Sequence, residues 1–114
     1  MRFALGVPTI LEYGDPRLLL GLATSAEQAG WDGFFLWDHL VYRAEGDPVA
    51  DPWTTLAAVA SRTQSIRLGV MVTVLARRRP WKVARETATL DVLSGGRLVF
   101  GAGLGSLGRE EFAA

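Results

Sequence analysis

The sequence predicts an α/β fold with parallel strands. Short apolar segments alternate with longer segments in which apolar residues recur at helical spacing, in the order βαβαβαβ. A helical segment separates each pair of consecutive strands, and such connections require parallel pairing with right-handed crossovers. We expect residues 1–114 to form a single domain.

Local signals place the first strand and the first helix. Residues 3–7 form the first predicted strand, and Pro8 ends it because proline cannot donate to a central sheet ladder. Asp15-Pro16 begins a helix, since the carboxylate can cap free amides and proline at the first position loses no hydrogen bond. Gly30 is a natural left-handed stop for that helix.

The middle of the chain repeats the same signals. Residues 33–37 form a second strand that is apolar throughout, and a long polar loop follows at residues 38–50. Asp51-Pro52 then begins a second helix with the same capping device. Residues 66–75 are rich in β-branched and aliphatic side chains and predict the third strand.

The last helix and strand complete the alternation. Pro80 opens a helix that runs to about residue 93, where the Ser-Gly-Gly segment at 94–96 ends it. Residues 97–102 form the fourth strand, and a glycine-rich loop leaves it. Periodicity does not distinguish an open doubly wound sheet from a (β/α)8 barrel, but a complete barrel typically needs about 250 residues. The chain would supply somewhat under half of one.

The composition excludes several classes of function. With 12 basic and 12 acidic residues, the chain has no general positive field for nucleic acid. It has no cysteine and one histidine, so neither a thiolate site nor a histidine-built zinc site is expected. It shows no signal-peptide pattern and no apolar run of membrane-spanning length. We therefore expect a cytoplasmic protein without nucleic-acid or membrane partners.

The polar pair Asp38-His39 directly follows the apolar strand at residues 33–37. Polar residues at the carboxyl ends of parallel strands are where α/β enzymes place their chemistry. An imidazole can take or give a proton near neutral pH, and Asp38 could tune it only if the two side chains converge. The alternative is that His39 merely caps backbone groups at the end of the strand.

Five segments, in this order and spacing, resemble the luciferase-like monooxygenases, the family of bacterial luciferase and the coenzyme F420-dependent oxidoreductases. They are Leu36-Trp37-Asp38-His39, Asp51-Pro52-Trp53-Thr54, Ser65-Ile66-Arg67-Leu68-Gly69, Arg77-Arg78-Arg79-Pro80 and Leu90-Asp91-Val92-Leu93-Ser94-Gly95-Gly96-Arg97. The resemblance covers essentially the whole chain, and it matches only the N-terminal part of family members.

The resemblance implies a partial TIM (β/α)8 barrel, with about three βα units and the fourth strand. A half-barrel leaves unpaired edge strands and an uncovered sheet face, which proteins normally pair or cover. The resemblance therefore implies either a truncated product or a half-barrel completed by a copy of itself, as a homo-oligomer, or by a second chain.

The resemblance also implies a redox site for FMN or coenzyme F420 at the carboxyl ends of the strands. His39 matches the position of a base near the substrate carbon, and Asp38 that of an acid contacting the deazaflavin. In relatives a bulge with a non-proline cis peptide presses on the ring system, which corresponds here to Met71, Val72 and Thr73. The Met71-Val72 bond is the first candidate and Val72-Thr73 the second.

The glycines after the fourth strand support two interpretations. Residues 103–108 satisfy the G-x-G-x-x-G pattern of dinucleotide sites, but the chain lacks the following helix and the acidic residue about 20 positions on. In the family, Gly101, Gly103 and Gly105 would let the backbone approach the cofactor. Ser106 stands where F420-dependent sugar-phosphate dehydrogenases carry an acidic glutamate, which argues against that particular reaction.

The leading functional prediction is therefore a flavin- or F420-dependent oxidoreductase or monooxygenase acting on a small-molecule substrate. It would transfer hydride at a planar ring or activate oxygen, and it would need the remaining half of the barrel. The alternative is a non-catalytic half-barrel or structural subunit. A third, weaker interpretation is an open nucleotide-binding fragment, which would bind NAD instead.

Overall fold

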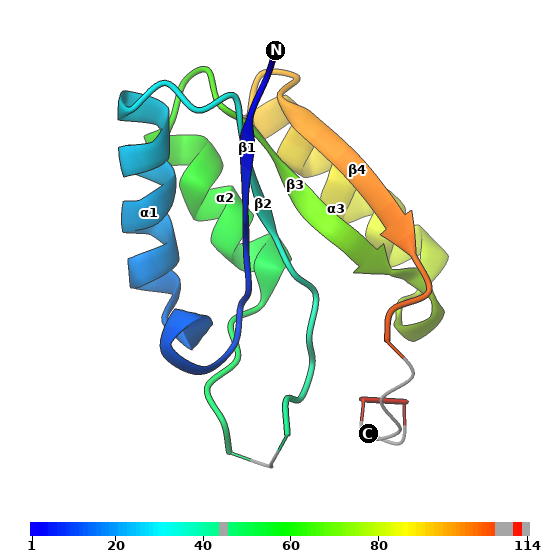
Figure 1. Ribbon diagram of the computed structural model, residues 1–114. Coiled ribbons are helices and arrows are strands. Elements are labelled where there is room, and N and C mark those ends of the chain that lie inside the picture. Colours follow the sequence, from blue (N-terminus) through cyan, green and yellow to red (C-terminus); the bar gives the residue numbers. More distant parts are fainter. Residues whose placement is uncertain (44–45, 107–110, 113–114) are drawn as a thin grey trace.

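The computed structural model describes residues 1–43, 46–106 and 111–112. Strands and helices alternate along the chain as the sequence predicts (Figure 1). In chain order the elements are β1 (Ala4–Val7), the 3-10 helix η1 (Leu11–Gly14), α1 (Pro16–Gln28), β2 (Gly33–Leu36), α2 (Pro52–Arg62), β3 (Arg67–Val74), the 3-10 helix η2 (Leu75–Arg77), α3 (Pro80–Leu93) and β4 (Leu98–Gly103).

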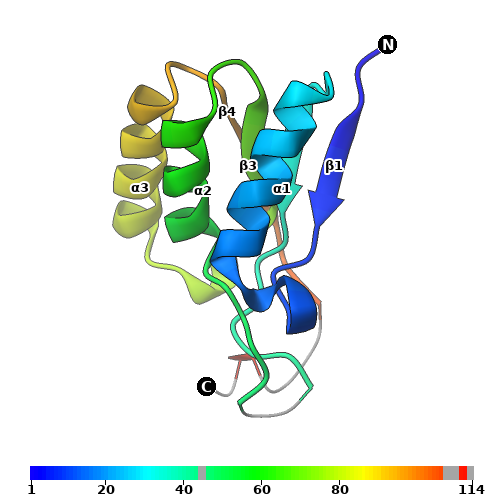
Figure 2. The same cartoon turned by 90° about the vertical axis from the view of Figure 1, so that its left-hand side faces the viewer.

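The four strands form one sheet in the order β1-β2-β3-β4, and every pair is parallel. The three α-helices cover one face of this sheet, side by side in the order α1, α2, α3 (Figures 1 and 2). The predicted α/β class and parallel pairing are confirmed. Strand β4 continues one residue beyond the expected boundary, to Gly103.

The Asp-Pro pairs cap their helices as expected. Asp15 Oδ1 accepts a hydrogen bond of 2.9 Å from the backbone N–H of Arg17, and Asp51 Oδ2 accepts one of 2.7 Å from that of Thr54. Each helix begins with the proline after its cap. Gly30, just past α1, has a φ of +87°, a conformation that glycine adopts without steric cost.

The hydrophobic core lies between the sheet and the helices. It combines alternate residues of the strands with one stripe of each helix. Its buried members are Val7, Leu19, Ala23, Ala26, Phe34, Leu36, Ala50, Trp53, Leu56, Val59, Ala60, Ile66, Leu68, Val70 and Leu90. Packing of the helices against one face of the sheet therefore holds the strand ends in place, whatever covers the opposite face.

The opposite face of the sheet carries the Phe35 ring, glycines beside it and Arg67. Phe35 alternates with the core residues Phe34 and Leu36, so its ring points to this face. A Cβ on Gly33 would come within 2.7 Å of the Phe35 ring, and one on Gly69 within 3.1 Å. The ring thus lies over two glycines. Within the described residues, no helix covers this side.

Two charged side chains brace the amino ends of the strands. Arg97 donates hydrogen bonds of 2.6–3.0 Å through Nη1, Nη2 and Nε. The acceptors lie at the end of α2, just before β3 and in the turn before Arg97 itself. Glu27 at the end of α1 accepts bonds from the backbone N–H groups of residues 64–66. Such charge-assisted bonds are shorter and stronger than neutral ones. The Arg97 and Glu27 contacts therefore stabilise the amino ends of the strands.

The Glu27 contact gives a pH-dependent prediction. Burial alone would raise the pKa of Glu27, but the backbone N–H groups of Ser65, Ile66 and Gln64 together lower it below the usual 4.5. The stabilisation is therefore complete above about pH 4.5 and is lost as pH falls through the folded-state pKa. Glu27→Gln should lower the free energy of unfolding by about 1–2 kcal/mol at neutral pH.

Urea unfolding at several pH values tests this expectation. The difference between wild type and Glu27→Gln should shrink as pH falls below about 4.5. Asp91 is exposed on α3, and Asp91→Asn removes one carboxylate there as the matched control. A Glu27→Gln effect that stays constant across this pH range, or that Asp91→Asn reproduces, would contradict the assignment.

Candidate active site

A cleft of about 360 Å³ opens at the carboxyl ends of β2, β3 and β4. These ends and the loops that follow them gather at the bottom of Figure 1. The cleft is lined by Trp37, Asp38, His39, Met71, Val72, Val74, Leu104, Gly105, Ser106 and Glu111. Active sites of parallel α/β folds occupy this position.

Large apolar side chains stand exposed around this cleft. Trp37 is 43% exposed, Met71 56%, Val72 37% and Leu104 84%. They come from the end of β2, from β3 and from the segment after β4. An exposed apolar patch within a concave surface is typical of a ligand-binding site.

Asp38 is engaged by arginines rather than by its neighbour His39. Its Oδ1 accepts from Arg78 Nη2 at 2.6 Å, while Oδ2 accepts from Arg78 Nε at 3.1 Å and from the backbone N–H of Val74 at 2.9 Å. Arg77 Nη2 donates to the Asp38 carbonyl oxygen at 2.6 Å. Asp38 is only 7% exposed. Its carboxylate ties the end of β2 to the end of β3.

The His39 ring contacts the carboxylate of Glu111 instead of that of Asp38. Its Nδ1 lies 2.9 Å from Glu111 Oε1, although 72 positions separate the two residues. The ring also lies beside Trp37 and Tyr42, with ring centroids at 6.0 and 5.5 Å. The adjacent pair Asp38-His39 therefore diverges, and the condition for direct tuning of the imidazole by Asp38 is not met.

Glu111 is held in place from several directions. Its Oε1 accepts from the backbone N–H groups of Leu40 and Val41, at 2.9 and 3.4 Å, and Arg77 Nη1 lies 3.7 Å from Oε2. Burial alone would raise the pKa of Glu111, but the hydrogen bonds from His39 and Leu40 and the charge of Arg77 together lower it. The carboxylate is therefore ionised at neutral pH.

Two of the three arginines at residues 77–79 lie inward. Arg77 and Arg78 have side chains 10% and 20% exposed, and both pair with carboxylates of this chain. Arg79 is exposed, with its guanidinium 5.8 Å from the centre of the Trp81 ring. Arg77 and Arg78 thus organise the strand ends, because their charges are already matched by Asp38 and Glu111.

Strand β3 bulges at residues 71–73, where the resemblance implies a bulge with a non-proline cis peptide. The register with β4 shifts between Val70 and Thr73, and the Met71-Val72 peptide bond is cis. Met71 and Val72 face the cleft. Thr73 is instead fully buried, and its hydroxyl has no hydrogen-bond partner among the described residues.

The three glycines at the end of β4 fit against β3. A Cβ on Gly101 would lie 2.7 Å from the Val70 carbonyl oxygen, and one on Gly103 would lie 2.3 Å from Val72 Cγ2. Gly105 has a φ of +80°, and its Cβ would meet the Val74 side chain at 2.8 Å. Close packing against the bulged strand thus requires each of these glycines.

The structure brings together most of the predicted site residues. Asp38, His39, Met71, Val72 and Gly105 line the cleft, whereas the predicted Thr73, Gly101 and Gly103 do not. Sequence reasoning missed Trp37, Val74, Leu104, Ser106 and Glu111 as lining residues. The available signal was that Glu111 follows β4, and so lies at the same sheet edge as His39. Gly108 of the G-x-G-x-x-G pattern lies outside the described residues.

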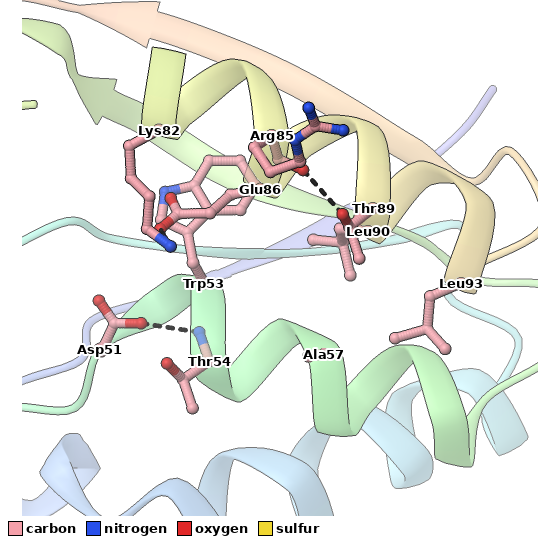
Figure 3. Close-up of a pocket in the computed structure, with 10 residues that line it drawn as sticks. All are labelled: Asp51, Trp53, Thr54, Ala57, Lys82, Arg85, Glu86, Thr89, Leu90 and Leu93. Carbon is pink, nitrogen blue, oxygen red and sulfur yellow. Dashed lines mark hydrogen bonds and ion pairs between the residues drawn. The ribbon is translucent and has the colours of Figure 1, made fainter. Parts of the chain in front are cut away.

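A second groove, of about 300 Å³, lies between α2 and α3 (Figure 3). Lys82 Nζ and Glu86 Oε1 lie 3.5 Å apart across one turn of α3, and Trp53 Nε1 and Glu86 Oε2 have no hydrogen-bond partner in the described part of the chain. This groove is on the helical layer. None of the predicted catalytic or cofactor-binding residues lines it.

Two other kinds of feature are absent from the described residues. Of the helices in the described ranges, none is long and apolar enough to cross a membrane. Over those same ranges, no cluster of three or more His, Cys, Asp or Glu side chains could hold a metal ion.

Comparisons with known proteins agree with this architecture. Residues 3–112 match the luciferase-like monooxygenase family. An F420-dependent glucose-6-phosphate dehydrogenase from Beutenbergia cavernae is 42% identical over 105 residues, 89% of this chain and 31% of the relative. A limonene 1,2-monooxygenase from Rhodococcus erythropolis is 40% identical over 88 residues, 77% of this chain and 22% of the relative.

The oxygenating constituent of 3,6-diketocamphane monooxygenase from Pseudomonas putida, solved with FMN, superimposes with a TM-score of 0.84 at 22% identity. The superposition covers 99% of this chain and 32% of that structure. The chain thus spans at most about a third of the length of these relatives. The architecture is that of a partial (β/α)8 barrel. The chain belongs to the luciferase-like monooxygenase family.

Proposed function

We propose that this chain forms the cofactor-facing part of an oxidoreductase that uses coenzyme F420 or FMN to act on a small-molecule substrate. The observation that carries the proposal is the cleft at the strand ends, where the half-buried His39 lies beside the exposed residues Met71 and Val72. The F420-dependent and monooxygenase relatives support hydride transfer and oxygen activation, respectively, as the two reaction types.

The residues present fit the ring system of such a cofactor. Met71, Val72 and Leu104 offer exposed apolar surface, and Trp37 adds an aromatic face. Gly105 also lines the cleft. Arg77 and Arg78 are already paired with carboxylates, so they are poor candidates for anchoring a cofactor phosphate.

In this proposal the chain supplies proton transfer and positioning. A bound F420 or FMN would exchange a hydride with the substrate or, for reduced flavin, react with oxygen. His39 would hold or move the proton at the substrate atom that reacts, since an imidazole can both donate and accept a proton through its ring nitrogens. Asp38 would act mainly by fixing the end of β2 against β3, because Arg78 and the Val74 N–H occupy its carboxylate.

The proposal includes further strands that cover the bare sheet face. The edge strands β1 and β4 each have one neighbour among the described strands, and no described helix covers the sheet face opposite α1, α2 and α3 (Figure 2). Apolar sheet faces and open edges are normally covered or paired. A second copy of this chain or another chain would supply that cover, and the mass of the protein in solution tests which.

Fluorescence titration of the purified chain with F420 and with FMN tests the function. We expect saturable binding of one of them, weakened at least tenfold by Leu104→Asp, because an exposed carboxylate would face the apolar ring. Val92→Asp is the matched control: Val92 is 83% exposed on α3, Leu104 is 84% exposed, and Val92 lies outside the cleft. Melting temperature should stay nearly unchanged in both variants.

The alternative is a non-catalytic half-barrel or structural subunit, which would keep the packing of sheet and helices without binding either cofactor. Failure of both cofactors to bind to the chain in its native oligomeric state would overturn the enzymatic proposal in favour of this alternative. Equal loss of binding in Leu104→Asp and Val92→Asp would place the cofactor elsewhere. NAD serves as the comparison ligand, since saturable NAD binding would favour a nucleotide-binding fragment.

A further inference from the structure

We propose that Glu111 is the positioning residue of His39, which it fixes in the Nδ1–H tautomer so that Nε2 is the nitrogen free for proton transfer. The inference deepens the proposed function, because it assigns a second residue to the same cleft. It rests on contacts of the chain alone.

The first step is that backbone contacts alone fix the position of the Glu111 carboxylate, independently of the imidazole. Oε1 of Glu111 accepts two backbone N–H groups, those of Leu40 and Val41, directly after His39. Glu111 is only 7% exposed. Rotation of this side chain would leave both N–H groups without their acceptor, so the position of Oε1 is fixed by the backbone.

The second step concerns the proton on the ring. An ionised carboxylate is a hydrogen-bond acceptor only, so the nitrogen 2.9 Å from Oε1 must be the donor. Arg77 Nη1, 3.7 Å from Oε2, favours the ionised form. In a neutral imidazole one nitrogen donates and the other accepts. Nε2 then carries the free lone pair.

The third step is that Nε2 remains available. Within the described ranges, the His39 ring makes one hydrogen bond, to Glu111. The His39 side chain is 19% exposed. The charged and titratable groups near it are Glu111, Tyr42 and, through Arg77, Asp38. None of these occupies Nε2, and His39 lines the cleft.

Nitrogen-15 NMR of the imidazole tests the assignment directly. His39 is the one histidine in the chain, so the spectrum reports a single ring. At alkaline pH, where an unconstrained neutral imidazole favours the Nε2–H tautomer, we expect the wild type to show Nδ1–H as the major form. Glu111→Ala should lose that preference, whereas Glu111→Gln should keep it because the amide oxygen can still accept.

Asp91→Ala, on the exposed face of α3, is the control and should leave the tautomer unchanged. An Nε2–H majority in the wild type would overturn the inference, and this result does not depend on whether any variant folds. Retention of the Nδ1–H form in Glu111→Ala would also overturn it and would leave Glu111 as a backbone anchor. The measurement needs no cofactor, so failure of the cofactor titration would count against the proposed function without affecting this result.

Discussion

Asp38→Ala is expected to lower the free energy of unfolding by about 3–5 kcal/mol, the usual cost of removing one partner of a buried ion pair. The Asp38 side chain is 3% exposed and that of Arg78 is 20% exposed. The substitution would leave the Arg78 guanidinium without a counter-charge and the Val74 N–H without an acceptor. Urea unfolding at neutral pH measures the effect.

Two further variants show whether the ion pair is the cause. Asp51→Ala removes only a helix cap and should cost about 1 kcal/mol. The double variant Asp38→Ala with Arg78→Ala should cost less than the sum of the two single changes, because no buried charge remains unmatched. A loss in Asp38→Ala no larger than that in Asp51→Ala, or strict additivity in the double variant, would contradict the expectation.

Gly69→Ala is the second substitution for which a large effect is expected. A Cβ at this position in β3 would lie 2.1 Å from the Val99 carbonyl oxygen of β4. The obstacle is backbone on a neighbouring strand, so the two strands must move apart. Overpacking of this kind costs typically about 1–3 kcal/mol, and contact with backbone places Gly69→Ala at the upper end of that range.

Gly6→Ala is the matched control for this substitution. Gly6 is also a strand glycine, in β1, and a Cβ there would meet nothing within 4 Å. Glycine in a strand interior carries an entropic cost relative to alanine, so Gly6→Ala should be neutral or slightly stabilising. Denaturant unfolding of both variants gives the comparison. Equal stability changes would show that β3 and β4 tolerate separation.

The fold could be predicted from the sequence because its signals are local. The Asp-Pro pairs at residues 15–16 and 51–52 mark helix starts through contacts two and three residues away, respectively. Gly30 marks a helix end through its own φ. The strand at residues 33–37 is apolar enough to indicate a strand of a parallel sheet packed against helices. Strand boundaries differ from the expected ones by at most one residue, because tertiary pairing determines where each ladder ends.

The site could be predicted only in part, because its contacts are distant in sequence. His39 and Asp38 were correctly placed at a strand end, but their adjacency suggested a pair that the structure separates. The partner of His39 is Glu111, 72 positions away, and no spacing rule connects the two. Likewise, nothing in the run of arginines indicated that Arg78 would bind Asp38 while Arg79 stayed exposed.

The fit of the β4 glycines against β3 matters for how sequence patterns are used to assign function. A search for dinucleotide-binding proteins by glycine spacing would retrieve this chain, since Gly103 and Gly105 begin a matching pattern. Here those glycines make room for Val72 and Val74 of the adjacent strand. A glycine pattern after a strand can therefore encode the shape of its neighbour, and the residue opposite each glycine distinguishes strand packing from phosphate binding.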